Sequence, residues 1–186
     1  MATKGGYNGA SSDVLREELA QSLRRLRVDA IDLYYLHRVD REVPLEESLG
    51  VLAEHREAGT IRHVGISAVS VEQIEQAQRV VPITAVQNEY SLSERSSDAV
   101  VDHCAAAGIV FVPYFPLRHV GGAELERVAE AREATPSQIA LAWLLQRSPA
   151  MLPIPGTLSV DHVRENLAAR DIALSADEVR ALEHAA

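Results

Sequence analysis

The chain has 186 residues, of which 47% are hydrophobic and 24% charged, a composition typical of one soluble globular domain with a sizeable core. Its formal net charge of −9 argues against a nucleic-acid partner, which would require a basic face. No apolar run approaches the ~20 residues of a membrane span, and we see no signal-peptide core. The single cysteine, Cys104, cannot build a disulfide framework or a zinc site, so we expect a cytoplasmic protein with no metal.

Short strand-like runs alternate along the chain with longer helical patterns. Six runs are predicted as strands, and they cover residues 2–5, 30–36, 62–67, 83–87, 109–114 and 151–155. Most of them are continuously apolar rather than alternating, which is typical of strands covered on both faces.

The segments between these runs carry helix signals. The spacing of Leu15, Leu19, Leu23 and Leu26 predicts an amphipathic helix. Further start and stop signals are Pro44 and Gly59 around the next helix, capping boxes at Ser70 with Gln73 and at Thr135 with Gln138, Gly108 as a helix end, and Ser175 with Glu178 at the last helix.

Repeated strand-then-helix units imply a parallel sheet with right-handed crossovers. Periodicity alone leaves open whether that sheet is doubly wound or curled into a barrel. The Gly-x-Gly-x-x-Gly signature of the dinucleotide-binding folds is absent. We see no linker or low-complexity tract, so residues 1–186 are predicted to form a single domain.

Polar and aromatic residues collect where the predicted strands end. In parallel α/β folds the carboxyl ends of the strands carry the functional groups. Each such residue also has an ordinary structural explanation, such as a solvated lysine, a hydrogen-bonding histidine, turn residues or a core tyrosine. The set comprises Lys4, His37, Ser67, Gln87, Asn88, Tyr114 and the run Pro155, Gly156, Thr157.

Five segments resemble, in order and spacing, those of the aldo-keto reductase family. They are residues 22–34 before His37, IRHVGIS at 61–67, VQNEYSL at 86–92, PYFPL at 113–117, and IPGT at 154–157 with its continuation to 167. The resemblance implies a (β/α)8 barrel enzyme that transfers a hydride between NADP(H) or NAD(H) and a small carbonyl substrate. It further implies an N-terminally truncated barrel, with strands 3–8 and their helices but without the first two βα units.

The resemblance also assigns roles to residues. Lys4 and His37 match two of the family's catalytic side chains. Ser67 and Gln87 match positions that hold the nicotinamide carboxamide, and Tyr114 matches the aromatic residue that stacks on the nicotinamide ring. Thr157, Glu165 and Asn166 match positions near the adenosine portion. The other residues that match cofactor-binding positions are Leu117, Gly156 and His162.

Several positions depart from the family pattern. Ala68 stands where an asparagine is usual, and the segment 156–162 has no lysine or arginine for a cofactor 2′-phosphate, so preference between NADPH and NADH stays open. No residue replaces the family's catalytic aspartate and tyrosine by position. Tyr7, the nearest tyrosine to Lys4, is expected in an exposed loop, and Tyr35 is expected in the core.

Three functions are therefore compatible with the sequence. The first is an aldo-keto reductase with impaired activity. The second is a non-redox acid–base enzyme, a dehydratase, isomerase or cyclase, that uses Lys4 and His37. The third is a non-catalytic remnant. Because an incomplete barrel leaves two open edges, we expect a homo-oligomer that covers them.

Overall fold

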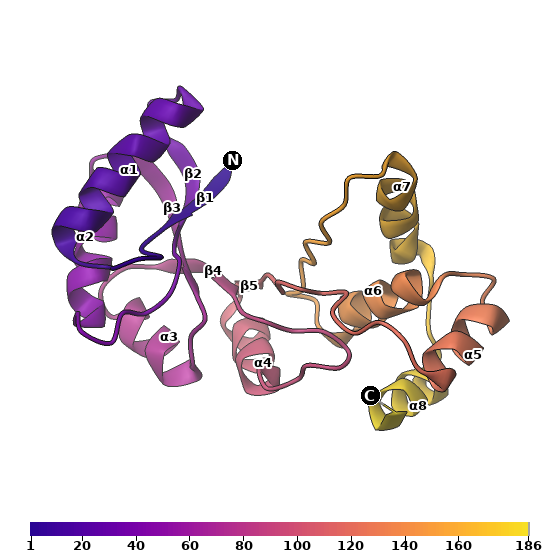
Figure 1. Ribbon diagram of the computed structural model, residues 1–186. Helices are drawn as coiled ribbons and strands as arrows, with labels where there is room; N and C mark the ends of the chain where they lie inside the picture. Colours follow the sequence, from indigo (N-terminus) through magenta and orange to yellow (C-terminus); the bar gives the residue numbers. More distant parts are fainter. Residues whose placement is uncertain (186) are drawn as a thin grey trace. The chain divides into compact units, whose positions relative to one another are not determined.

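The computed structural model describes residues 1–185, and contacts within the chain divide it into two compact units, Met1–Gln87 and Asn88–Ala186 (Figure 1). The expectation of a single domain over residues 1–186 stays a prediction. Each unit is described below by itself.

The first unit is built on four parallel strands, which pair in chain order. They are β1 (Ala2–Gly5), β2 (Ile31–Leu36), β3 (Ile61–Ser67) and β4 (Ile83–Gln87). Their register places Lys4 beside Tyr35, and Tyr35 beside Gly65. The first four predicted strands are therefore confirmed to within one residue at each end.

Three helices complete this unit: α1 (Ser12–Leu26), α2 (Leu45–Glu57) and α3 (Val71–Gln78). Figure 1 shows α1 and α2 on the same side of strands β1 to β3. Leu15 and Leu19 of the apolar stripe are fully buried, and the capping box of Ser70 with Gln73 is present. One helix start differs, because Pro44 has an extended ψ of 134° and so precedes α2 instead of being its first residue.

The second unit is mainly helical. It contains α4 (Asp98–Ala107), β5 (Val110–Phe111), α5 (Ala123–Ala131), α6 (Pro136–Arg147), α7 (Val160–Ala168), a 3-10 turn at Ala169–Asp171, and α8 (Ala176–Ala185). Its core centres on α6, where the Trp143 ring stacks on Tyr90 with a centroid separation of 5.8 Å. The predicted caps at Thr135 and Gly108 are confirmed.

The last two predicted strands are shorter than expected. The run 109–114 forms a strand only at Val110–Phe111, and the run 151–155 contributes an isolated parallel bridge between Met151 and Phe111. Prolines explain the difference, since Pro113, Pro153 and Pro155 have no amide hydrogen to extend a ladder.

An ion-pair cluster lies at the start of the sheet. The Met1 ammonium is 2.6 Å from Asp32 on β2, and Arg62 on β3 binds the other oxygen of the same carboxylate. The hydrogen bond and charge of the Met1 ammonium, with those of Arg62, hold the pKa of Asp32 below its usual value. Asp32 on β2 is therefore ion-paired both to Met1, which precedes β1, and to Arg62 on β3.

Candidate active site

Two of the predicted site residues meet although they lie on the outermost strands of the first unit. Lys4 on β1 donates a hydrogen bond from Nζ to Oε1 of Gln87 at the end of β4. Neighbouring strands are about 4.8 Å apart, so β1 and β4 would be roughly 14 Å apart in a flat sheet. Side chains span that gap only if the sheet curves, and the contact therefore lies on its concave face.

His37 adjoins Lys4 at the same end of the sheet. Its backbone N–H donates to the carbonyl of Gly5 over 2.7 Å, which places it beside the residue after Lys4. Partial burial lowers the pKa of His37, and the positive charges of Lys4 and Arg38 lower it further. The imidazole is consequently neutral at pH 7 and can donate one hydrogen bond and accept another.

Ser67 and Gln87 complete this group, which we call the strand-end cluster (Lys4, His37, Ser67 and Gln87). Ser67 and Gln87 are paired in the β3–β4 register and are only 2% and 4% exposed. Ala68 follows with a positive φ of 57°, and its N–H donates to the Gln87 carbonyl. The structure thus brings four of the predicted residues to one edge of one sheet.

Tyr7 is exposed, as expected, but its position has a consequence that the sequence did not reveal. Its ring centroid lies 4.9 Å from that of His37, and the Arg38 guanidinium lies 4.7 Å above the Tyr7 ring. The available signal was an aromatic residue three positions after a strand-end lysine, because β1 pairs with β2, which ends one residue before His37. Tyr35 is buried, as expected, and burial raises its pKa to about 12.

Glu18 is a second neighbour of the strand-end cluster that sequence reasoning missed. Its Oε2 accepts a hydrogen bond of 2.6 Å from the backbone N–H of Gly6, and its charge acts to raise the pKa of His37. Glu18 belongs to α1 and is separated from Gly6 by the loop that precedes the helix. No local pattern marks it, because the contact depends on how α1 packs on β1.

In the second unit, three predicted cofactor residues line one open pocket. Tyr114, Leu117 and Gly156 contribute to it, and its remaining walls are Phe115, Pro116, Arg118, Ile154 and Pro155. Burial raises the pKa of Tyr114, whose ring packs edge-on against Phe115. Gly156 has no heavy atom within 4 Å of the place a Cβ would take, so the pocket is open there.

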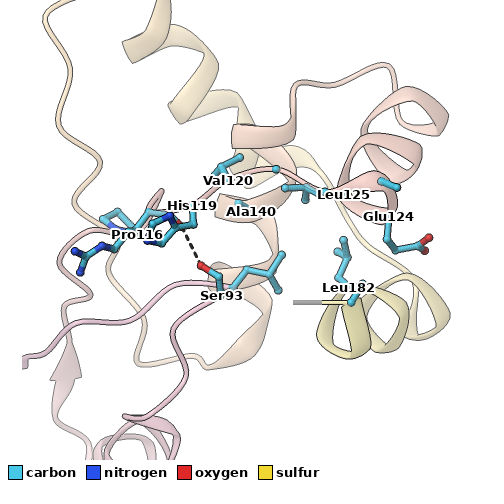
Figure 2. A pocket seen from close by; sticks show the side chains of 14 residues that line it. Ser93, Pro116, His119, Val120, Glu124, Leu125, Ala140 and Leu182 are labelled. Atoms are coloured by element: carbon cyan, nitrogen blue, oxygen red, sulfur yellow. Dashed lines mark hydrogen bonds between the residues drawn. The ribbon is translucent and has the colours of Figure 1, made fainter.

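The loop after Tyr114 also borders a second pocket, which the sequence did not predict. Figure 2 shows it between the loop and helices α5, α6 and α8, with Leu125, Ala140 and Leu182 on its apolar side. The Ser93 hydroxyl donates to the Arg118 carbonyl over 3.0 Å, and the Arg118 side chain pairs with Glu89. Both contacts fix the loop within its own unit.

The remaining predicted residues form what we call the α7 group (Thr157, His162, Glu165 and Asn166). Thr157 Oγ1 lies 3.3 Å from His162 Nδ1 and accepts a hydrogen bond from the Ser159 N–H. The Glu165 carbonyl accepts from Gln138 on α6 over 3.2 Å. Arg164, the only arginine or lysine among residues 157–166, pairs with Asp161 over 3.0 Å and is exposed.

Within residues 1–185 no group of three or more His, Cys, Asp or Glu side chains is arranged to hold a metal ion. In the same range, no helix combines the length and the hydropathy that crossing a bilayer requires.

Comparison with known proteins identifies the family. The model of the aldo/keto reductase family matches residues 1–123 and 121–186. An uncharacterised oxidoreductase of Schizosaccharomyces pombe is 41% identical over 95% of this chain and 62% of its own length. Pyridoxine 4-dehydrogenase of Escherichia coli is also 41% identical, over 91% of this chain and 62% of its own. The chain thus spans about three-fifths of these relatives.

Solved structures agree with this result. A thermostable aldo-keto reductase in complex with the inhibitor epalrestat has a TM-score of 0.92 and 34% identity, covering 98% of this chain and 70% of that one. An aldo/keto reductase from Klebsiella pneumoniae in complex with NADP and acetate has a TM-score of 0.85 and 28% identity, covering 98% and 68%. The predicted α/β barrel fold is thereby confirmed for the part present, and the chain belongs to the aldo/keto reductase family.

Proposed function

We propose that this chain carries the lysine–histidine side of a carbonyl reductase that uses NADP(H) or NAD(H). The observation that supports it is the convergence of Lys4, Gln87 and His37 on the concave face of the β1–β4 sheet. An ammonium, a neutral imidazole and a buried amide at one position can bind a carbonyl oxygen and stabilise negative charge that develops on it.

The side chains divide this work between them. The neutral His37 imidazole donates a hydrogen bond that orients the carbonyl of the substrate. The Lys4 ammonium, held by Gln87, contributes positive charge to the same space. Tyr7, whose ring lies against His37, forms one wall of the space that a substrate would enter.

The second unit offers residues that fit a nicotinamide cofactor. The open pocket at Tyr114, Leu117 and Gly156 combines an aromatic ring, apolar walls and the Arg118 guanidinium. In the first unit, taken by itself, Ser67 and Gln87 are the residues proposed to bind a carboxamide, and Gln87 keeps its Nε2 donors because Lys4 occupies only Oε1. His162 and the rest of the α7 group would bind the adenosine portion. When bound, the cofactor supplies or accepts the hydride.

Cofactor binding is the direct test. Titration of the chain with NADPH and NADH, followed by nucleotide fluorescence, should give saturable binding. Tyr114→Ala should weaken it, while Arg180→Ala on α8, outside the pocket, should leave it unchanged. Absence of binding at millimolar cofactor would remove the reductase proposal.

Turnover is a separate question, because the chain covers only part of its relatives. A panel of small aldehydes should include pyridoxal, since one relative is a pyridoxine 4-dehydrogenase. Any NAD(P)H oxidation should be lost in Lys4→Ala and in His37→Ala. Activity unaffected by both substitutions would place the reaction elsewhere.

We also propose that the chain forms a homo-oligomer in the cytoplasm. Its support is a set of exposed apolar side chains near α7: Leu152, Ile154, Leu158, Val160, Val163 and Leu167. Exposed apolar side chains that form a contiguous patch mark surfaces that bind another protein. Size-exclusion chromatography with light scattering should show more than one chain per particle, and a stable monomer would contradict the proposal.

A further inference from the structure

Lys4 is chemically unique in this chain. Of the 18 lysine and arginine residues, 17 are arginines and Lys4 is the only lysine. The chain therefore has two primary amines, the ε-amine of Lys4 and the α-amine of Met1. Arginine keeps its charge at every working pH, so only these two nitrogens can act as nucleophilic amines at neutral pH.

The surroundings of Lys4 differ from those of a solvated surface lysine. The side chain is partly buried, and its partner is the neutral amide oxygen of Gln87. Among residues 1–185, no carboxylate makes an ion pair with Nζ. Burial lowers the pKa of Lys4 and no opposing charge restores it, so a larger fraction of the amine is unprotonated.

A proton acceptor lies next to this amine. The positive charge of Lys4 helps to lower the pKa of His37, and the His37 backbone N–H donates to the Gly5 carbonyl. The other ionisable groups near His37 are Glu18, Arg38 and Tyr7, and Tyr35 neighbours Lys4 in the strand register. Tyr35 is buried and remains neutral, so His37 is the group suited to exchange protons with the Lys4 nitrogen.

We propose that Lys4 is a nucleophilic amine that condenses reversibly with aldehydes at the strand-end cluster to form an imine. The Nζ lone pair attacks the carbonyl carbon, the C–N bond forms, and the carbonyl electron pair goes to oxygen, which receives one of the two amine protons through His37. His37 then accepts the second amine proton and delivers it to the departing hydroxyl. Water leaves, a C=N bond remains, and no oxidation or reduction occurs.

This activity is distinct from carbonyl reduction, in which Lys4 stays a charged hydrogen-bond donor. It needs no nicotinamide cofactor, so the two proposals can fail independently. Its substrates are small aldehydes, and its product is a covalent adduct at a single identifiable residue.

Reductive trapping tests the proposal on the intact chain. The protein is incubated at pH 7 with propanal and sodium cyanoborohydride, which converts an imine into a stable propylamine. Mass spectrometry should find Lys4 modified severalfold faster than Nα-acetyl-lysine under the same conditions. Fragmentation of the N-terminal peptide separates modification at Lys4 from modification at Met1.

A lysine introduced elsewhere provides an internal control. Arg56 is exposed on α2 and lies in the same unit, so Arg56→Lys adds a solvated ε-amine without altering the strand-end cluster. Lys4 should react severalfold faster than the new amine in the same sample. Equal rates at the two positions would overturn the proposal without requiring any change at the site.

Two variants test the roles of the neighbours. Gln87→Glu places a carboxylate beside the ammonium, which should raise the pKa of Lys4 and shift the labelling profile to higher pH. His37→Gln should slow labelling at pH 7 while leaving the rate at the introduced amine in Arg56→Lys unchanged. A labelling profile that moves in neither variant, or modification confined to Met1, would contradict the mechanism.

Discussion

The strand-end cluster and the α7 group differ in how the fold holds them. Lys4 and Gln87 lie in the last residues of strands of a hydrogen-bonded sheet, and His37 directly follows β2. Ser67 and Gln87 are almost fully buried. By contrast, within residues 160–168 helix α7 buries none of its side chains, and Leu167 is 62% exposed. One set of predicted residues is fixed by a packed core, whereas the other depends on a short helix.

This difference indicates which predicted roles the isolated chain can perform. Groups positioned by a sheet keep their geometry when ligands are absent, which favours chemistry at the strand-end cluster. A helix with no buried face has little tertiary packing to stabilise it. We therefore expect the α7 group to order fully only when it binds another molecule.

Leucine truncation should show the largest contrast. Leu36→Ala, at a fully buried position at the end of β2, should lower the free energy of unfolding by about 2–5 kcal/mol. Leu167→Ala on α7 should change it by no more than about 0.5 kcal/mol, because that side chain has little contact to lose. Urea unfolding of both variants measures the two values, and a large loss in Leu167→Ala would show that α7 is covered in solution.

Removal of the Lys4 partner should have a smaller effect. Gln87→Leu deprives a partly buried ammonium of its acceptor, and we expect a loss of about 1 kcal/mol at pH 7, since Lys4 retains some solvent contact. The loss should shrink as pH rises and the amine loses its proton. Asn166→Leu is the control in the α7 group, and an equal loss there would contradict the comparison.

Removal of a helix cap should lower the stability of the whole protein at α3 but affect only the helix itself at α7. Ser70→Ala removes the capping box of α3 and should lower the free energy of unfolding by about 1 kcal/mol. Ser159 caps α7 by accepting from the His162 N–H, so Ser159→Ala should mainly increase amide hydrogen exchange in residues 160–168. Unchanged exchange in α7 would mean that this helix is held by contacts other than its cap.

The titration of His37 should give the smallest and most specific signal. Its pKa is below the ordinary value of 6.5, so the folded state binds fewer protons than the unfolded state just below pH 6.5. Stability should accordingly fall as pH drops through 6.5, and His37→Gln should reduce that fall. Lys4→Gln should raise the pKa of His37 in an NMR titration, and an unchanged pKa would show that the two charges do not interact.

Most of the fold could be predicted from local sequence patterns. The continuous apolar runs predicted the first four strands, and the capping boxes at Ser70 and Thr135 predicted two helix starts. The strands after Gly108 were overestimated, because apolar composition suggested length while Pro113 and Pro153 interrupt the ladder, which continues beyond Pro113 only as an isolated bridge at Tyr114. Proline position was therefore the better guide to where these strands stop.

The candidate site was predictable where it depends on strand ends. Lys4, His37, Ser67 and Gln87 were found because parallel strands end at a common edge. The contacts of Tyr7 with His37 and of Glu18 with Gly6 were not found, since they depend on loop conformation and on the packing of α1. Contacts of this kind leave no periodic pattern in the sequence, and they are seen only in the three-dimensional structure.

The ion pair between the Met1 ammonium and Asp32 has a practical consequence for recombinant work. A fusion tag joined ahead of Met1 would convert that ammonium into an uncharged amide and leave Arg62 as the remaining cationic partner of Asp32. The Asp32 carboxylate would then gain protons at a higher pH, and the stability that its lowered pKa contributes above the ordinary value of 3.8 would be smaller in tagged protein, a difference that disappears in acid. Stability comparisons of variants at neutral pH therefore require samples that all have the same group ahead of β1.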